Sequence, residues 1–100
     1  MTISLQPASA QNITANGQTI TLPSQQYSQL LTSTGAYTGL ILTAGSTDGQ
    51  LLILINNGGN ALTFAAAGTS NVADGVSAVI PANRLMFLQW SQAASLWFRA

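Results

Sequence analysis

The sequence predicts an all-β fold, a single antiparallel β-sandwich of the jelly-roll type with about eight short strands and at most one short helical turn. Short runs rich in Ile, Leu, Thr and aromatic residues recur between clusters of Gly, Asn, Ser and Pro, a spacing typical of sandwiches and barrels rather than of βαβ units. Leu, Ile, Val and Phe together make up 26 of the 100 residues, which is too many for a disordered chain. We therefore expect one folded domain with a modest core.

The N-terminal residues are expected to lie outside the sandwich proper. Thr2 to Gln6 predicts a short first strand, and Pro7 to Gln11 is small and polar, as in a loop or an arm over a neighbouring surface. We accordingly divide the one domain into an N-terminal strand and arm, residues 1–17, and a β-sandwich, residues 18–100. No exact internal repeat is present, so a solenoid or a propeller is not predicted.

Two strand patterns follow, separated by an ambiguous stretch. Gln18 to Leu22 alternates apolar and polar residues as a half-buried strand does. Tyr37 to Thr43 predicts another strand, in which Gly39 marks a bulge or a close backbone approach. Between them, residues 24–34 fit a short helix, because three large residues have helical spacing, but they also suit a strand. The sequence leaves that choice open.

The most apolar strand is predicted from Gln50 to Asn56. Leu51 to Ile55 places aliphatic side chains on both faces of a strand, and a sheet with one solvated face cannot bury both sets. A second apolar contact is therefore expected, either within the subunit or between subunits. Asn57 to Asn60 contains residues that adopt positive φ easily, which predicts a hairpin with Ala61 to Phe64 returning antiparallel to the preceding strand.

The last third of the chain predicts a loop, a short strand and a hairpin. Residues 65–75 are small and polar, and Val76 to Ile80 predicts a short strand that ends at a proline. Arg84 to Trp90 and Ser95 to Arg99 predict two strands joined by a polar connection. Leu85 to Leu88 is apolar on both faces, so both faces of this strand are expected to be covered.

Only four residues carry a formal charge, and the chain has no Lys, Glu, His or Cys. Most acid–base and nucleophilic catalysis needs those residue types, so we predict no enzyme, no catalytic residue, no cofactor and no metal site. The two carboxylates, Asp48 and Asp74, each precede a Gly, and we interpret them as turn residues that cap backbone N–H groups. A net charge of zero provides no field to attract nucleic acid or a membrane surface, so neither is expected as a partner.

Two aromatic and two basic residues are candidates for binding. Trp90 and Trp97 fit a saccharide-stacking platform, but packing in the core or at a subunit seam is the favoured interpretation. Arg84 and Arg99 have few carboxylates to pair with inside the chain, which makes them candidates for contacts with acidic groups on another protein. Surface solubility alone is nearly as good an explanation of both arginines.

Several motifs form one pattern: Asp48-Gly49-Gln50, Asn56-Asn57-Gly58-Gly59, Leu62-Thr63-Phe64, the strand from Arg84 to Trp90, and Trp97. This pattern, over roughly residues 37–100, resembles the small β-sandwich modules of tailed bacteriophages. Such modules occur as trimeric capsid decoration (cement) proteins and as distal domains of tail spikes and fibres.

The resemblance implies a homotrimer that is assembled in the host cytoplasm and sits on the outer capsid surface of the virion. There it would bind the major capsid protein and stabilise the DNA-filled shell by mass action. A chain of 100 residues has little room for a fibre adaptor and shaft, so capsid decoration is the first expectation. A receptor-binding tip module of a tail fibre or spike, with a host surface glycan as ligand, is the alternative. The residues expected at subunit or capsid contacts are Leu52, Leu54, Arg84, Trp90, Trp97 and Arg99.

Overall fold

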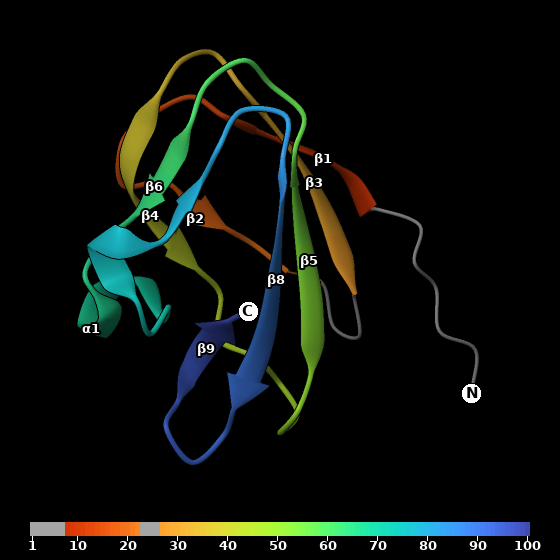
Figure 1. Cartoon of the computed structure of the whole chain (residues 1–100), viewed down its shortest axis with the longest axis vertical. Coiled ribbons are helices and arrows are strands. Elements are labelled where there is room, and N and C mark those ends of the chain that lie inside the picture. The colour runs from red at the N-terminus through yellow and green to blue at the C-terminus, as the bar shows by residue number, and fades with distance from the viewer. Residues whose placement is uncertain (1–7, 23–26) are drawn as a thin grey trace.

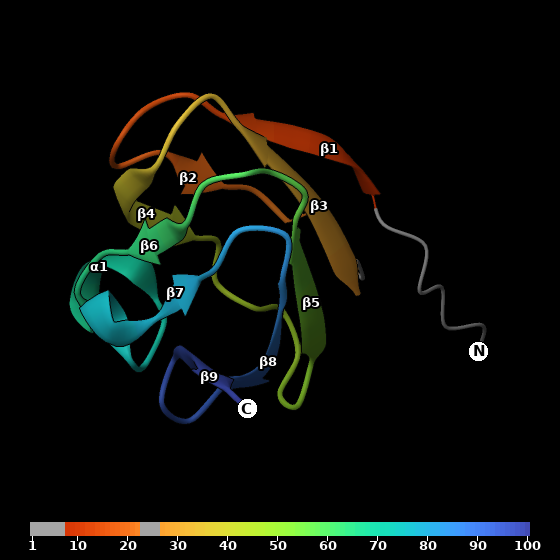
Figure 2. The ribbon, with the colours of Figure 1, turned by 45° about the horizontal axis from the view of Figure 1, so that its top comes forward.

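Two β-sheets enclose one core in the computed structural model, which describes residues 8–22 and 27–100 (Figures 1 and 2). The elements of these residues are β1 (Ala8–Ile13), β2 (Thr19–Ile20), β3 (Ser28–Ser33), β4 (Tyr37–Leu42), β5 (Leu51–Asn56), β6 (Leu62–Phe64), α1 (Ala67–Ser70), η1 (Gly75–Ser77), β7 (Val79–Ile80), β8 (Leu85–Ser91) and β9 (Leu96–Arg99). One sheet has the strand order β1-β3-β5-β8-β9, and the other has the order β2-β4-β6-β7. The all-β prediction is confirmed, with nine strands in the described residues.

The chain changes sheet after each of its first five strands, so β1 to β6 wind as three successive coils around the core (Figure 2). Within each sheet the successive strands are parallel, β1 to β3 to β5 and β2 to β4 to β6. Antiparallel pairing is confined to β5 with β8, β6 with β7, and β8 with β9. The sheets are therefore mixed, and the predicted purely antiparallel jelly roll is wrong. Parallel neighbours need a crossover connection, which the opposite sheet supplies here.

The predicted hairpin at Asn57 to Asn60 is also wrong, because this loop carries the chain from one sheet to the other. Both edges of β5 are occupied by β3 and β8, and β6 pairs with β4 and β7 instead. The Asn56 side chain, 1% exposed, fixes this crossing. Its Nδ2 donates to the carbonyl oxygens of Asn60 at 2.9 Å, Ile80 at 3.1 Å and Pro81 at 3.1 Å. The turn residues were identified correctly, but the buried amide decides where the chain goes.

The N-terminal predictions meet the structure only in part. The strand expected at Thr2 to Gln6 lies outside the described residues. Most of the stretch predicted as a loop or arm belongs to β1, because Ala8–Ile13 pairs in parallel with β3 at the edge of the five-stranded sheet. A small polar sequence suits an edge strand, which buries little of its surface.

The ambiguous stretch is a strand, since Ser28–Ser33 forms β3 between β1 and β5. Residues 24–26 of that stretch lie outside the description. The described residues contain two short helical elements, so the expectation of at most one is wrong: α1 lies within the predicted loop 65–75, and η1 replaces the first residues of the predicted 76–80 strand. Asn71, with a φ of 66°, ends α1. Within the described residues, no helix is long and apolar enough to cross a membrane.

Gly39 was expected to mark a bulge or a close backbone approach, and this prediction is confirmed. It lies in the strand Tyr37–Leu42 with a φ of +70°, beside an irregularity in the pairing of β4 with β6. A Cβ at this position would lie 3.6 Å from the backbone nitrogen of Gly17, so the two chain segments approach closely here. The C-terminal hairpin is confirmed as well, since β8 and β9 pair antiparallel with Trp90 opposite Trp97.

The two tryptophans pack against each other in the core. Trp90 and Trp97 are 3% and 0% exposed, and their ring centroids lie 5.4 Å apart at a tilt of 59°. Both indole N–H groups are satisfied: Trp97 Nε1 donates to the Thr43 carbonyl at 2.9 Å, and Trp90 Nε1 donates to Gln92 Oε1 at 2.7 Å. Gly45 packs directly on Trp90, and a side chain at Gly45 would overlap the indole. Position 45 therefore has no room for a side chain beside Trp90.

Candidate interaction face

The side of the five-stranded sheet that points away from the core is apolar, and we call it the outer face. Side chains alternate between two faces along a strand, and in β8 the exposure alternates at every residue from Leu85 to Trp90. The residues of β5, β8 and β9 that form the outer face are Leu51, Ile53, Ile55, Leu85, Phe87, Gln89 and Phe98. Four of them are large apolar residues with about half of their surface exposed: Leu51 58%, Leu85 51%, Phe87 53% and Phe98 47%.

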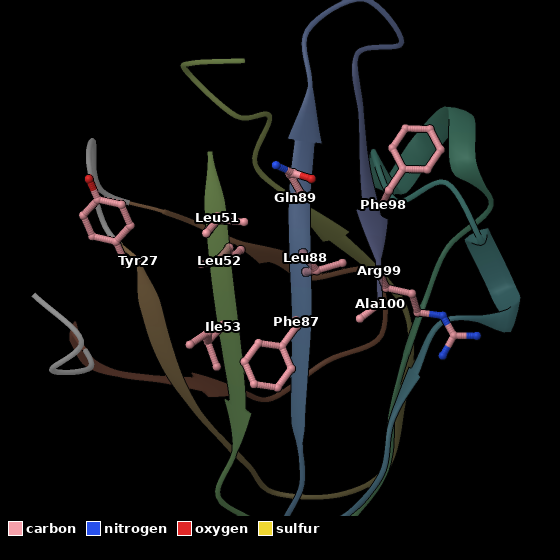
Figure 3. A pocket seen from close by; sticks show the side chains of 10 residues that line it. All are labelled: Tyr27, Leu51, Leu52, Ile53, Phe87, Leu88, Gln89, Phe98, Arg99 and Ala100. Atoms are coloured by element: carbon pink, nitrogen blue, oxygen red, sulfur yellow. The ribbon is translucent and has the colours of Figure 1, made fainter. Parts of the chain in front are cut away.

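A hollow of about 450 Å³ lies over the middle of the outer face (Figure 3). Ile53 and Phe87 are opposite each other on β5 and β8 and form its floor. The rings of Tyr27 and Phe98 stand at opposite margins of the hollow (Figure 3). Gln89, paired with Leu51 on one side and Phe98 on the other, adds an amide to the otherwise apolar surface. The hollow is therefore suited to apolar side chains with a few hydrogen-bonding groups.

The charged residues lie at the borders of the outer face. Arg84 precedes Leu85 at the start of β8 and lines a smaller hollow with Ile55 and Leu85. Asp48 lies toward the other end of β8, where it lines a hollow with Gln89 and Phe98. Asp48 also accepts a hydrogen bond from the backbone N–H of Gln92 at 2.9 Å.

Arg99, at the end of β9, lines the central hollow but is already engaged. Its guanidinium forms an ion pair with Asp74, with both side chains partly exposed. Arg99 was expected to have few carboxylates to pair with inside the chain, and it pairs with one of the two that the chain has. The prediction that Asp74 caps a turn with its side chain is wrong, because no such cap bond forms at η1. The pair joins the segment before η1 to β9, two elements that a sequence pattern does not connect.

The two carboxylates of the chain take part in separate contacts, Asp74 with a guanidinium and Asp48 with a backbone N–H. Among the described residues, no three His, Cys, Asp or Glu side chains gather where they could hold a metal ion. What the outer face can do chemically is exclude water against another apolar surface.

The residues expected at subunit or capsid contacts divide into two groups. Leu52, Leu54, Trp90 and Trp97 are 1%, 0%, 3% and 0% exposed and lie in the core of the subunit. Arg84 is exposed, and Arg99 is exposed but paired. Because both indole rings are buried, neither tryptophan presents a free face on which a saccharide could stack.

The residues expected at contacts included none of the outer-face side chains Leu51, Ile53, Phe87 and Phe98, although both faces of β5 and of Leu85 to Leu88 were expected to be covered. The sequence pattern identified β5 as apolar on both faces, but both faces of such a strand look alike in a sequence. The signal that distinguishes them lies in β8, where the polar Gln89 shares a face with Leu85 and Phe87, whereas Met86, Leu88 and Trp90 form a wholly apolar set.

Comparisons with known proteins give one match. A family model described as the phage depolymerase C-terminal beta sandwich domain matches residues 8–98. A search of curated proteins found no match, and neither did a search of solved structures. The matched range includes β1 to β8 and all of β9 except its last residue, Arg99.

Proposed function

We infer that this chain serves as a non-catalytic structural module of a phage tail spike or fibre, because it belongs to the phage depolymerase C-terminal beta sandwich domain family. The observation that carries this inference is the match of the family model to residues 8–98. The two-sheet β architecture of the chain supports it. In this proposal the module acts through its surfaces and leaves polymer cleavage to other parts of the spike.

The family match favours the tail over the capsid shell. A capsid decoration protein was the first expectation from the sequence. The description of the matched family, however, names phage depolymerases and does not name capsid proteins. We therefore propose that the module is part of the tail of the phage virion. We no longer propose the major capsid protein as its partner. A glycan-binding role loses its expected platform, because Trp90 and Trp97 are buried.

The homotrimer expected from the sequence stays part of the proposal. A chain with four charged residues in 100 has little surface charge to keep copies apart, and low net charge favours association. The apolar outer face adds a surface on which association would remove hydrocarbon from water. Self-association is thus the assembly mode that the chemistry of the module best supports.

Quantitative mass spectrometry of purified virions tests the proposed function. We expect the copy number of this chain to match that of the tail proteins and to lie far below that of the major capsid protein. A ratio near one to one with the major capsid protein would instead support a shell-wide decoration protein. Absence from virions that contain all other tail proteins would reject both readings.

A further inference from the structure

We propose that the outer face of the five-stranded sheet, centred on Phe87, is the surface through which this chain binds a second copy of itself. The inference deepens the proposed function and rests on it in one respect, since a spike is the setting in which copies of the chain meet. It names the surface and the residues, which neither the sequence pattern nor the family match provides.

The exposed apolar area is large for a surface left in water. Leu51, Leu85, Phe87 and Phe98 are 47% to 58% exposed, and each leaves on the order of 100 Å² of apolar surface accessible. Together they approach the size of the largest apolar patch on a typical monomer, roughly 300–600 Å², which is often functional. A standard interface buries about 800 Å² per partner. These four side chains therefore supply about half of one side, as the apolar centre of an interface does.

The placement of charge indicates what covers this area. No charged side chain stands among Leu51, Ile53 and Phe87, and the guanidinium of Arg99 at the margin is neutralised by Asp74. A partner with charges on its binding surface would bury them without counterions, which is costly. This chain has only four charged residues. The outer face of a second copy is therefore an uncharged, apolar surface that can cover the first without burying a charge.

The charged residues at the two ends of the outer face also favour a second copy of this chain as the binding partner. Arg84 borders one end and Asp48 borders the other, and both side chains are exposed. When copies meet at the apolar middle of the face, both charges remain at the rim, where water and counterions solvate them. In a homotrimer whose copies turn the outer face toward the three-fold axis, the residues in the middle of the face meet their own copies, and Phe87 is the residue expected there.

Sedimentation velocity of the full 100-residue chain tests this inference with a matched pair of variants. Phe87→Glu places a charge in the middle of the outer face, and we expect it to weaken association at least tenfold. Val76→Glu makes the same change at a residue that is 66% exposed on η1, which packs against β6, and we expect association like that of the unmodified chain. Phe87→Ser provides a milder, uncharged disruption, and circular dichroism verifies that each variant is folded.

Three results would overturn the inference: an unmodified chain that stays monomeric at tens of micromolar, Phe87 variants that associate as the unmodified chain does, and equal losses in the Phe87 and Val76 variants. These outcomes are separate from the test of the proposed function. A monomeric chain present in virions at a tail-like copy number would reject this surface and keep the tail assignment. Association through Phe87 together with a one-to-one capsid ratio would keep the surface and reject the tail.

Discussion

Replacing Trp97 with Ala is expected to lower the free energy of unfolding by about 3–5 kcal/mol, the cost of truncating a large buried aromatic residue. Trp97 is 0% exposed, its ring stacks obliquely on Trp90, and its Nε1 donates to the Thr43 carbonyl. Its backbone also accepts from the N–H of Ala73 at 2.8 Å and donates to the Asn71 carbonyl at 2.7 Å. Small domains have a total stability of about 5–15 kcal/mol, so this loss removes a large part of it.

Phe98→Ala is the matched control, because Phe98 is the next residue of β9 and is also aromatic but is 47% exposed on the outer face. We expect it to change stability by less than about 1 kcal/mol. Urea unfolding of both variants, followed by tryptophan fluorescence from Trp90 and by circular dichroism, measures the difference. Equal losses in the two variants would show that the division of β9 into a core face and an outer face is incorrect.

Leu54→Asp is expected to abolish folding, whereas Ile53→Asp is expected to leave the fold intact and abolish self-association. Leu54 is 0% exposed in the core, and an unpaired carboxylate there costs several kcal/mol. Ile53 is the adjacent residue of β5, partly exposed on the outer face opposite Phe87. The same substitution one residue apart therefore tests two different properties.

Solubility, circular dichroism and sedimentation velocity distinguish these outcomes. The expected result is insoluble or unfolded protein for Leu54→Asp and a folded monomer for Ile53→Asp. A folded Leu54→Asp variant would contradict the assignment of the core. Association of Ile53→Asp at the level of the unmodified chain would contradict the assignment of the outer face.

Local sequence patterns were sufficient for most of the strands. The alternation at Gln18 to Leu22, the apolar run after Gln50 and the C-terminal pair of strands all correspond to strands in the structure. The special role of Gly39 was also predictable, because a glycine within a strand often marks a bulge or a close approach of two backbone segments. Each of these properties depends on residues that are close in sequence.

The pairing of strands was not predictable in the same way, because it depends on contacts between distant residues. Asn57 to Asn60 has the composition of a hairpin, but the amide of Asn56 hydrogen-bonds to carbonyls about 25 residues away and the chain crosses to the other sheet. The parallel winding of β1 to β6 likewise leaves no exact repeat in the sequence. A turn composition shows that the chain reverses and does not show which strand receives it.

The sequence predicted that the apolar strands have two apolar faces, but it did not predict which side chains form the exposed face. The apolar pattern of β5 correctly indicated apolar side chains on both faces of the strand, but the residues chosen there as candidate contacts were Leu52 and Leu54, which face inward. The ion pair of Arg99 with Asp74 joins residues 25 positions apart, and no local pattern links them. Which face of a strand is buried, and which charges meet, are decided by tertiary packing.

The most direct test of the account is cryo-electron microscopy of the intact phage tail at a resolution that shows side chains. The account predicts copies of this module in a tail spike or fibre, packed against one another through β5 and β8 with Phe87 at the contact. Copies on the capsid shell, or tail copies whose outer faces point into solvent, would contradict it.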